Sequence, residues 1–218
     1  MALFSRKPKP FDRTATLALA ETARTRGRRK KAIALYRRVL DADPKDLTVH
    51  GKIAPLLARA GKRDDALASF RVAWEGQFRA GFVDRSLAVL RQAVDLYPEE
   101  IALWEEIARL HLQRGRRADA VSALVEAGGR LWKVRQPLAA VKALRRALEI
   151  EPWHPEATML LARALAKDGR IDDALTLLDG LGNRVRGKTL RRARRLAFRL
   201  SPTPARLWRW FRAMIGGR

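Results

Sequence analysis

Hydrophobic residues along this chain recur three or four positions apart, in stretches that end at Gly or Pro. The clearest stretch lies between Pro98 and Gly115, and its apolar stripe consists of Leu103, Ile107 and Leu110. A second helix is predicted from about residue 118 to 133, and a third from Pro137 to Pro152. No stretch shows the two-residue alternation that predicts strands. The pattern therefore predicts an all-α fold.

The same residue types return at an interval of 54 positions. The series are Pro44, Pro98 and Pro152; Gly61, Gly115 and Gly169; Asp65, Asp119 and Asp173; Ala54, Ala108 and Ala162; and Ala66, Ala120 and Ala174. Each interval holds three predicted helices, and the third covers 82–97 and 137–151 in the first two repeats. Recurrence at this length is typical of a solenoid, in which each repeat buries its apolar face against its neighbours.

Large and small residues also fall at fixed positions within each repeat. The W-x2-L-G-x2-Y spacing is occupied by Trp104, Ile107, Ala108 and His111, and the A-x3-F spacing by Ala120 and Leu124. The second half of another unit is matched by Gly27, Ala32, Tyr36 and Pro44. This pattern resembles the tetratricopeptide repeat, a helix-turn-helix unit of about 34 residues. Because the interval here is 54, the resemblance implies a right-handed α-solenoid of such hairpins, with a third helix added to each pair as a 54-residue three-helix super-repeat.

Charge is distributed unevenly along the chain, whose formal net charge is +23. Residues 1–43 contain 12 basic and 4 acidic side chains, and residues 152–218 contain 15 basic and 5 acidic ones. Basic ends favour anionic partners such as nucleic acid, lipid headgroups or an acidic protein surface. We expect a basic flexible segment over 1–11, a repeat solenoid over 12–200, and a basic, Trp-rich amphipathic helix within 201–218.

One motif suggests nucleotide chemistry. The stretch GNRVRGKT, residues 182–189, matches the phosphate-binding loop G-x-x-x-x-G-K-[ST]. Such a loop must follow a buried strand and needs a nearby acid to help hold magnesium. Here the repeat places Asp173 and Leu178 on a helix just before the loop, and no carboxylate side chain follows Asp179. We therefore interpret the motif as a basic loop between two helices.

No other residues form a catalytic or metal-binding pattern. His50 and His111 fall at packing positions of the repeat, His154 lies in a Trp-His-Pro turn, and the chain has no Cys. Trp74, Trp104 and Trp132 fall in predicted helices, where a place in the core is expected. The sequence thus predicts a non-enzymatic protein with no catalytic residues, no metal site and no cofactor.

The C-terminal segment is strongly amphipathic. From 188 to 200 a narrow apolar stripe is surrounded by Arg191, Arg192, Arg194, Arg195 and Arg199, which we expect to face water. Thr203 is then predicted to cap a helix that begins at Pro204. One side of that helix holds Leu207, Trp208, Trp210, Phe211, Met214 and Ile215, and the other Arg206, Arg209 and Arg212.

Three interpretations of this helix stay open: a capping helix that covers the apolar end of the last repeat, an anchor on an anionic membrane surface, or a nucleic-acid contact. For an anionic surface the candidate residues are Arg191, Arg192, Arg195, Arg206, Trp208, Arg209, Trp210, Phe211 and Arg212.

The resemblance implies a concave face lined by the first helix of each repeat. Residues expected there are Thr48, Arg59, Glu105, Arg109, Gln113, Arg163 and Lys167. Four of the seven are basic, which favours an acidic or extended segment of another protein, although a merely solvated face has the same pattern. We expect a cytoplasmic scaffold or adaptor. The alternative is a membrane-associated protein at the inner face of the membrane, or a nucleic-acid-associated one, that binds through its tail; the Arg-rich and Ala-rich composition fits a bacterium.

Overall fold

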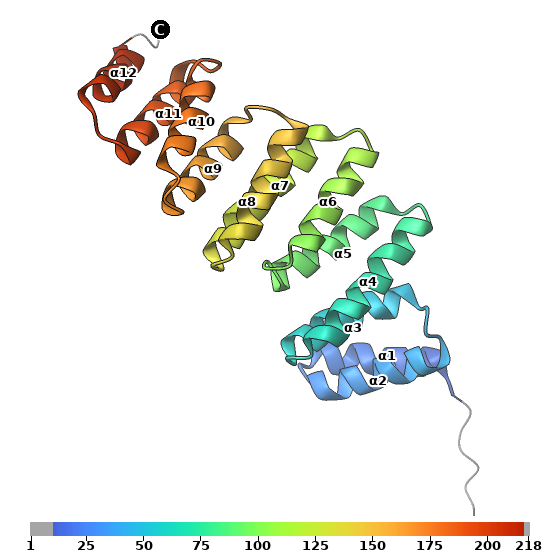
Figure 1. The fold of residues 1–218 in the computed structure, drawn as a ribbon. Helices are drawn as coiled ribbons and strands as arrows, with labels where there is room; N and C mark the ends of the chain where they lie inside the picture. The colour runs from blue at the N-terminus through green and yellow to red at the C-terminus, as the bar shows by residue number, and fades with distance from the viewer. Residues whose placement is uncertain (1–10, 216–218) are drawn as a thin grey trace, which may run out of the picture. The chain divides into compact units, whose positions relative to one another are not determined.

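The computed structural model describes residues 11–215, and twelve α-helices make up most of this part (Figure 1). Their bounds are α1 (Arg13–Thr25), α2 (Arg29–Ala42), α3 (Leu47–Arg59), α4 (Arg63–Arg79), α5 (Val83–Leu96), α6 (Ile101–Gln113), α7 (Arg117–Lys133), α8 (Pro137–Ile150), α9 (Pro155–Lys167), α10 (Ile171–Gly182), α11 (Gly187–Leu200) and α12 (Pro204–Ile215). None of the described residues forms a strand, and the predicted all-α helical-repeat solenoid is confirmed. Except for Phe11, the expected N-terminal segment 1–11 lies outside the described residues, as do 216–218.

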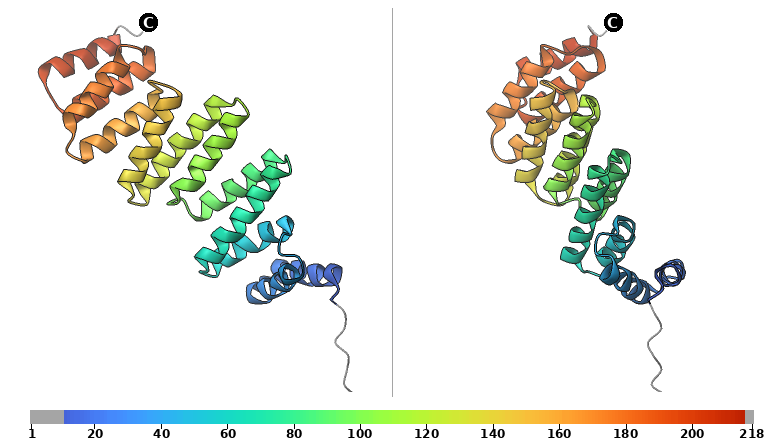
Figure 2. Two further views of the ribbon diagram at one scale, coloured as in Figure 1. Left: turned by 45° about the vertical axis from the view of Figure 1, so that its right-hand side comes forward. Right: turned by 90° about the vertical axis from the view of Figure 1, so that its right-hand side faces the viewer.

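The helices form two compact units, one that ends at Leu96 and one that begins at Tyr97. The first contains α1–α5 and the second α6–α12. Within each unit, successive helices pack against each other as antiparallel neighbours, as Figures 1 and 2 show from three sides. The division falls inside the segment 12–200 that the sequence suggested as one solenoid.

Residues that share a position in the repeat also share a place in the core. Ala66, Ala120 and Ala174 lie in the first turn of α4, α7 and α10, and all three are fully buried. Buried positions of the same register are Ile53, Ile107 and Leu161; Ala54, Ala108 and Ala162; and Phe70, Leu124 and Leu178. Small side chains let two helix backbones approach, and the larger ones fill the space beside them. Three helices per 54-residue interval are thus confirmed for α3–α5 and α6–α8.

Near the start of the first helix of two repeats, an aromatic ring nitrogen contacts the carbonyl oxygen of the preceding proline. The Trp104 indole N–H, fully buried, donates to the Pro98 carbonyl oxygen over 3.1 Å. Fifty-four residues earlier, His50 Nε2 lies 3.0 Å from the Pro44 carbonyl oxygen. Because a carbonyl oxygen only accepts, Nε2 must carry the proton in this contact. The packing role predicted for His50 is therefore confirmed.

The turn before the third helix adopts a left-handed backbone in three repeats. Gly27, Gly81 and Arg135 stand 54 residues apart, and their φ angles are 70°, 80° and 61°. Glycine takes this conformation without strain, whereas a side chain with a Cβ does not. Arg135 therefore occupies a position that the other two turns give to glycine.

Replacing Arg135 by Gly should relieve this strain. We expect Arg135→Gly to raise the free energy of unfolding by about 1 kcal/mol, measured by urea denaturation. Gly81→Ala should lower it by a similar amount, because no atom lies within 4 Å of an added Cβ there and only the backbone conformation opposes it. A loss of stability in Arg135→Gly would contradict this explanation.

A carboxylate joins the three N-terminal helices. Glu21 of α1 accepts hydrogen bonds from the Tyr36 hydroxyl of α2 (2.7 Å) and from Arg24 (2.9 Å), and its Oε1 lies 2.7 Å from Lys52 Nζ of α3. The Lys52 contact is the main cause that lowers the pKa of Glu21 to about 2, helped by Tyr36 and Arg24 against the opposing effect of burial. Burial, and then the bond to Glu21, raise the pKa of Tyr36 to about 12.

The lowered pKa makes the stability of the first unit depend on acid. Since the folded pKa of Glu21 lies below its ordinary value of 4.5, the stabilisation is present above that pH and is lost as pH falls toward 2. With the carboxylate 30% exposed, we expect Glu21→Gln to cost about 1–2 kcal/mol at pH 7 and little at pH 2, measured by urea denaturation across pH. Glu149→Gln, an exposed carboxylate of α8, is the control. An equal loss at both pH values would refute the assignment.

Candidate functional site

Two hollows adjoin around Trp132 at the end of α7. One, of about 400 Å³, is lined by Gly128, Trp132, Leu144, Leu160, Arg163, Ala164, Ala166, Lys167 and Leu200. The other, of about 410 Å³, is lined by Trp132, Pro137, Leu138, Val141, Arg145, Ala164, Leu165, Lys167, Asp168 and Arg170. They share Trp132, Ala164 and Lys167, and we call them together the Trp132 groove. The Lys167 ammonium lies 5.1 Å from the centre of the Trp132 ring, a cation–π contact.

The core position expected for Trp132 is wrong, because the indole is only partly buried. Helical spacing places this residue on the face of α7 that turns toward α8 and α9. Which part of that face the neighbouring helices leave uncovered depends on packing between segments distant in sequence. No local pattern of residues indicates this opening.

The structure places the predicted concave-face residues in different surroundings. Arg163 and Lys167 of α9 line the Trp132 groove. Glu105 and Arg109 of α6 line a separate hollow of about 640 Å³ beside α7 and α8. Gln113 is exposed at the end of α6, outside the lining of these hollows. In the first unit, Thr48 and Arg59 are exposed on α3, and the Arg59 carbonyl accepts a hydrogen bond from Arg29 over 2.6 Å.

The hollow of α6 is electrically balanced. Lys142 Nζ lies 2.8 Å from a Glu105 carboxylate oxygen, and Arg109 pairs with Glu106 on the same helix. The hydrogen bond to Glu106 raises the pKa of the Arg109 guanidinium above its ordinary value. The charges of Glu105 and Arg109 in this hollow are therefore already compensated by other residues of the protein.

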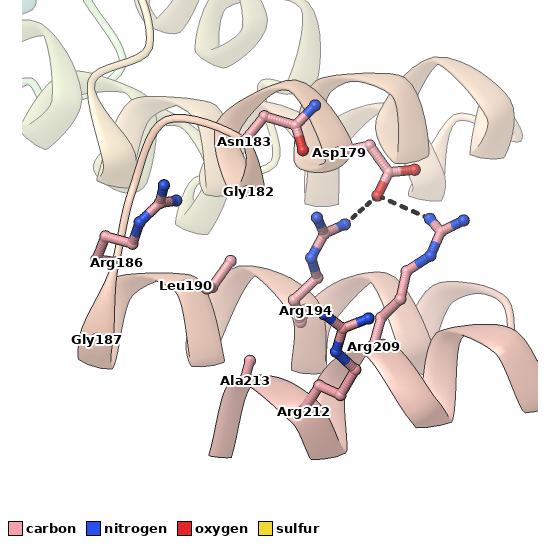
Figure 3. A pocket seen from close by; sticks show the side chains of 10 residues that line it. All are labelled: Asp179, Gly182, Asn183, Arg186, Gly187, Leu190, Arg194, Arg209, Arg212 and Ala213. Atoms are coloured by element: carbon pink, nitrogen blue, oxygen red, sulfur yellow. Dashed lines mark hydrogen bonds and ion pairs between the residues drawn. The ribbon is translucent and has the colours of Figure 1, made fainter. Parts of the chain in front are cut away.

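An arginine-rich cleft of about 1000 Å³ lies among α10, α11 and α12 (Figure 3). Its lining consists of Asp179, Gly182, Asn183, Arg186, Gly187, Leu190, Arg194, Arg209, Arg212 and Ala213. Asp179 pairs with Arg194 of α11, and its Oδ1 lies 3.5 Å from Arg209 Nη1 of α12. The lining thus contains one carboxylate and four guanidinium groups, and the carboxylate pairs with two of them.

The cleft follows from a break in the repeat. The middle helices α4 and α7 each have 17 residues, whereas α10 has 12 and ends at Gly182. The missing turns leave space beside the loop 183–186. Gly182 also lets Arg194 approach, because an added Cβ would lie 2.9 Å from the guanidinium carbon.

The phosphate-loop motif lies in this break. Helix α10 precedes it and α11 begins at Gly187, so the loop joins two helices and the predicted helical entry is confirmed. A phosphate-binding loop of the nucleotide-hydrolysing type requires a strand at that place. The glycines instead line the arginine-rich cleft.

Helix α12 packs on α11 (Figure 1). Arg206 and Trp210 are partly buried and Ala213 is buried, so they mark the side of α12 that faces the protein. Trp210 stacks on Phe198 with ring centres 5.8 Å apart, and Arg206 donates to the Ser201 hydroxyl over 2.7 Å. Thr203 is the N-cap of α12, as predicted, since its hydroxyl accepts a hydrogen bond from the Arg206 backbone N–H over 3.3 Å. Helix α12 therefore covers part of α11, while most of its own apolar side stays exposed.

The residues predicted for an anionic surface divide accordingly. Arg192 and Arg195 are exposed on α11, Arg191 partly so, and Arg212 is exposed and lines the cleft. Arg206 and Arg209 are held by the protein itself, and Trp210 is partly buried on Phe198. Trp208 and Phe211 are exposed and stack on each other at 6.1 Å. Arg194 does not face water as expected, because its pair with Asp179 leaves its side chain only 15% exposed.

Neither a metal centre nor a membrane span is found in the described part. Across residues 11–215 no three His, Cys, Asp or Glu side chains gather as a metal site would require. Within the same range no helix has the length and apolar character to cross a membrane.

Comparison with protein families gives a consistent assignment. One tetratricopeptide repeat model matches residues 2–46 and 76–130, and a second matches 131–196. The chain belongs to the tetratricopeptide repeat superfamily. Proteins of this superfamily are generally non-catalytic scaffolds that bind other proteins, and this repeat protein has the helical hairpins of such an interaction module.

Solved structures similar to this repeat protein include other chains of low sequence identity. MamA is 17% identical with a TM-score of 0.35, and the match covers 79% of this chain and 91% of that one. Yeast Tom70 is 17% identical with a TM-score of 0.42, and the match covers 87% and 40%. PilF of Pseudomonas aeruginosa is 17% identical with a TM-score of 0.33, and the match covers 94% and 89%. No curated protein sequence matches significantly.

The Asp179 pairs predict how α12 is held on this repeat protein. Asp179→Asn leaves the mostly buried Arg194 without its carboxylate and removes the link to Arg209. We expect the free energy of unfolding to fall by about 1–2 kcal/mol and amide exchange in α12 to accelerate. Asp172→Asn, at an exposed carboxylate in the first turn of α10, should change both much less. Unchanged exchange in α12 of Asp179→Asn would mean that other contacts fix the helix.

Proposed function

We propose that this chain is a non-enzymatic scaffold or adaptor that binds an extended, acidic segment of another protein in the Trp132 groove. The observation that supports this is the partly exposed Trp132 between two adjoining hollows, with Arg163 and Lys167 beside it. Solvent-accessible tryptophan in a concave site is a frequent centre of binding energy at protein interfaces.

The groove suits a segment that carries an apolar side chain. Leu144, Leu160 and Leu200 line one hollow with Trp132, and Pro137, Leu138 and Val141 line the other. An apolar side chain that buries about 100 Å² there would gain about 2.5 kcal/mol. The two adjoining hollows, which share the indole, offer places for two such side chains of an extended peptide.

The charges of the groove favour acidic residues beside that apolar side chain. Its lining has the cations Arg145, Arg163, Lys167 and Arg170 and one acid, Asp168. Arg170 already pairs with Asp173 at 2.6 Å. Lys167 lies over the indole and is exposed, so a carboxylate can bind it while the peptide packs on Trp132. Charges at the edge of a site select partners and speed association.

The separate hollow of α6 has a different character. Since Glu105 and Arg109 are compensated by Lys142 and Glu106, this part adds contact area without a strong charge preference. A partner that spans both places would have its acidic part at α9.

A peptide selection tests the proposal. Random peptides displayed on phage are selected on the wild-type protein, and we expect enrichment of acidic residues next to Leu, Phe or Trp. The selected peptides should bind the Arg163→Glu, Lys167→Glu double variant at least about ten-fold more weakly, by fluorescence anisotropy. Both side chains are exposed, so the variant should keep the circular dichroism of the wild type.

Arg116→Glu is the matched control, because Arg116 is an exposed cation at the other end of α7 from Trp132. It should bind the selected peptides as the wild type does. Equal binding by the double variant, or equal loss in the control, would reject the Trp132 groove as the binding site.

A further inference from the structure

Helix α12 presents an apolar face to solvent. The large side chains Leu207, Trp208, Phe211, Met214 and Ile215 are 43% to 68% exposed. At 100° per residue they lie opposite Ala213, the buried residue of this helix. We call these five residues the outer face of α12. Exposed apolar patches of this kind mark interaction sites on soluble proteins.

The orientation is set by contacts on the opposite side. Trp210 stacks on Phe198, Arg209 lies near Asp179, and Arg206 donates to Ser201. These interactions turn two of the three arginines of α12 toward the protein. As a result, the apolar residues are the outermost part of the helix.

Exposed cations lie on the neighbouring helix α11. Lys188, Arg192, Arg195 and Arg199 follow at intervals of four, three and four residues on α11, and all four are exposed. Arg186 and Arg212 add two more in the adjoining cleft. After Asp179 the chain has 12 basic and no acidic side chains. A second copy of this chain is therefore a poor partner, because like charges would meet.

The combination matches one kind of anionic surface. A single helix is convex and offers no groove to a peptide, whereas a bilayer accepts a convex apolar face along its whole length. A nucleic acid offers phosphates but no apolar phase for Leu, Met and Ile side chains on the outermost surface. Trp and Phe with flanking Arg are the residues that favour the boundary between headgroups and acyl chains.

We propose that α12 lies in the plane of an anionic phospholipid bilayer, with its outer face among the upper acyl chains, and with Arg212 on its flank and the exposed cations of α11 toward the lipid phosphates. This surface is distinct from the Trp132 groove. A protein partner could therefore be bound while α12 contacts the membrane.

Vesicle binding of the full chain tests this proposal. We expect co-sedimentation with phosphatidylcholine vesicles that contain phosphatidylglycerol, and binding at least about ten-fold weaker to phosphatidylcholine alone. Trp208→Ala with Phe211→Ala should weaken binding at least about ten-fold with unchanged circular dichroism. Met214→Glu, at a third exposed position, should act in the same direction if the double variant is poorly folded.

A fluorescent label reports which face enters the bilayer. Because the chain has no Cys, Ile215→Cys can be labelled alone with an environment-sensitive dye. Its emission should shift to the blue on anionic vesicles and be quenched by spin-labelled lipid. Leu19→Cys, a 54% exposed apolar position on α1, is the control and should show neither change.

Several results would overturn the proposal. They are no binding to anionic vesicles, equal binding by the Trp208 and Phe211 variant, or an Ile215 label that stays in water. Tighter binding to duplex DNA than to vesicles, insensitive to the two substitutions, would show that the arginines serve nucleic acid. Dimerisation that depends on Trp208 and Phe211 would show that the outer face pairs with a second copy. Loss of vesicle binding with intact peptide binding would leave the Trp132 groove unaffected.

Discussion

The close approach of neighbouring helices at buried alanines is the constraint on which this architecture depends. Ala66, Ala120 and Ala174 are fully buried at the start of α4, α7 and α10, where a larger side chain would separate the helices. With the backbones held at this distance, Phe70, Leu124 and Leu178 fill the adjacent space one turn later. Within α4, α7 and α10, helical geometry then fixes which other side chains face inward.

Both candidate sites lie where this regular packing stops. The Trp132 groove forms where α7, α8 and α9 leave one indole uncovered. The arginine-rich cleft forms where α10 is five residues shorter than α7. In regular repeats the recurring residues pack in the core. Side chains that can bind a partner are therefore found where the repeat is irregular.

Much of the fold was predictable because the relevant signals are local and repeated. Pro98, Gly115 and Ala120 mark helix ends and close contacts that the structure retains, and the helix before GNRVRGKT followed from the same register. The left-handed turn at Arg135 was not predictable. Gly27 and Gly81 occupy the same position in other repeats, but arginine does not indicate a positive φ angle.

The sites were less predictable, since they depend on contacts between distant segments. Periodicity divided α12 correctly into apolar and basic sides, but Asp179 and Phe198 determine which side faces the protein. Likewise, the exposure of Trp132 depends on α8 and α9. Arg163 and Lys167 were placed near a concavity because they share the register of the first helix in each repeat.

Helix α12 has one consequence for how this protein can change over time. Among its described residues only Ala213 is buried, so the repeats receive little of their hydrophobic stabilisation from this helix. The polar contacts of α12 determine which side of the helix faces the protein more than they determine the stability of the repeats. Substitutions on the outer face therefore meet few structural restrictions, and the tail can acquire or lose an attachment while the repeat core stays as it is. In evolutionary terms, the surface to which this protein attaches and the repeat core that binds its partner can change independently.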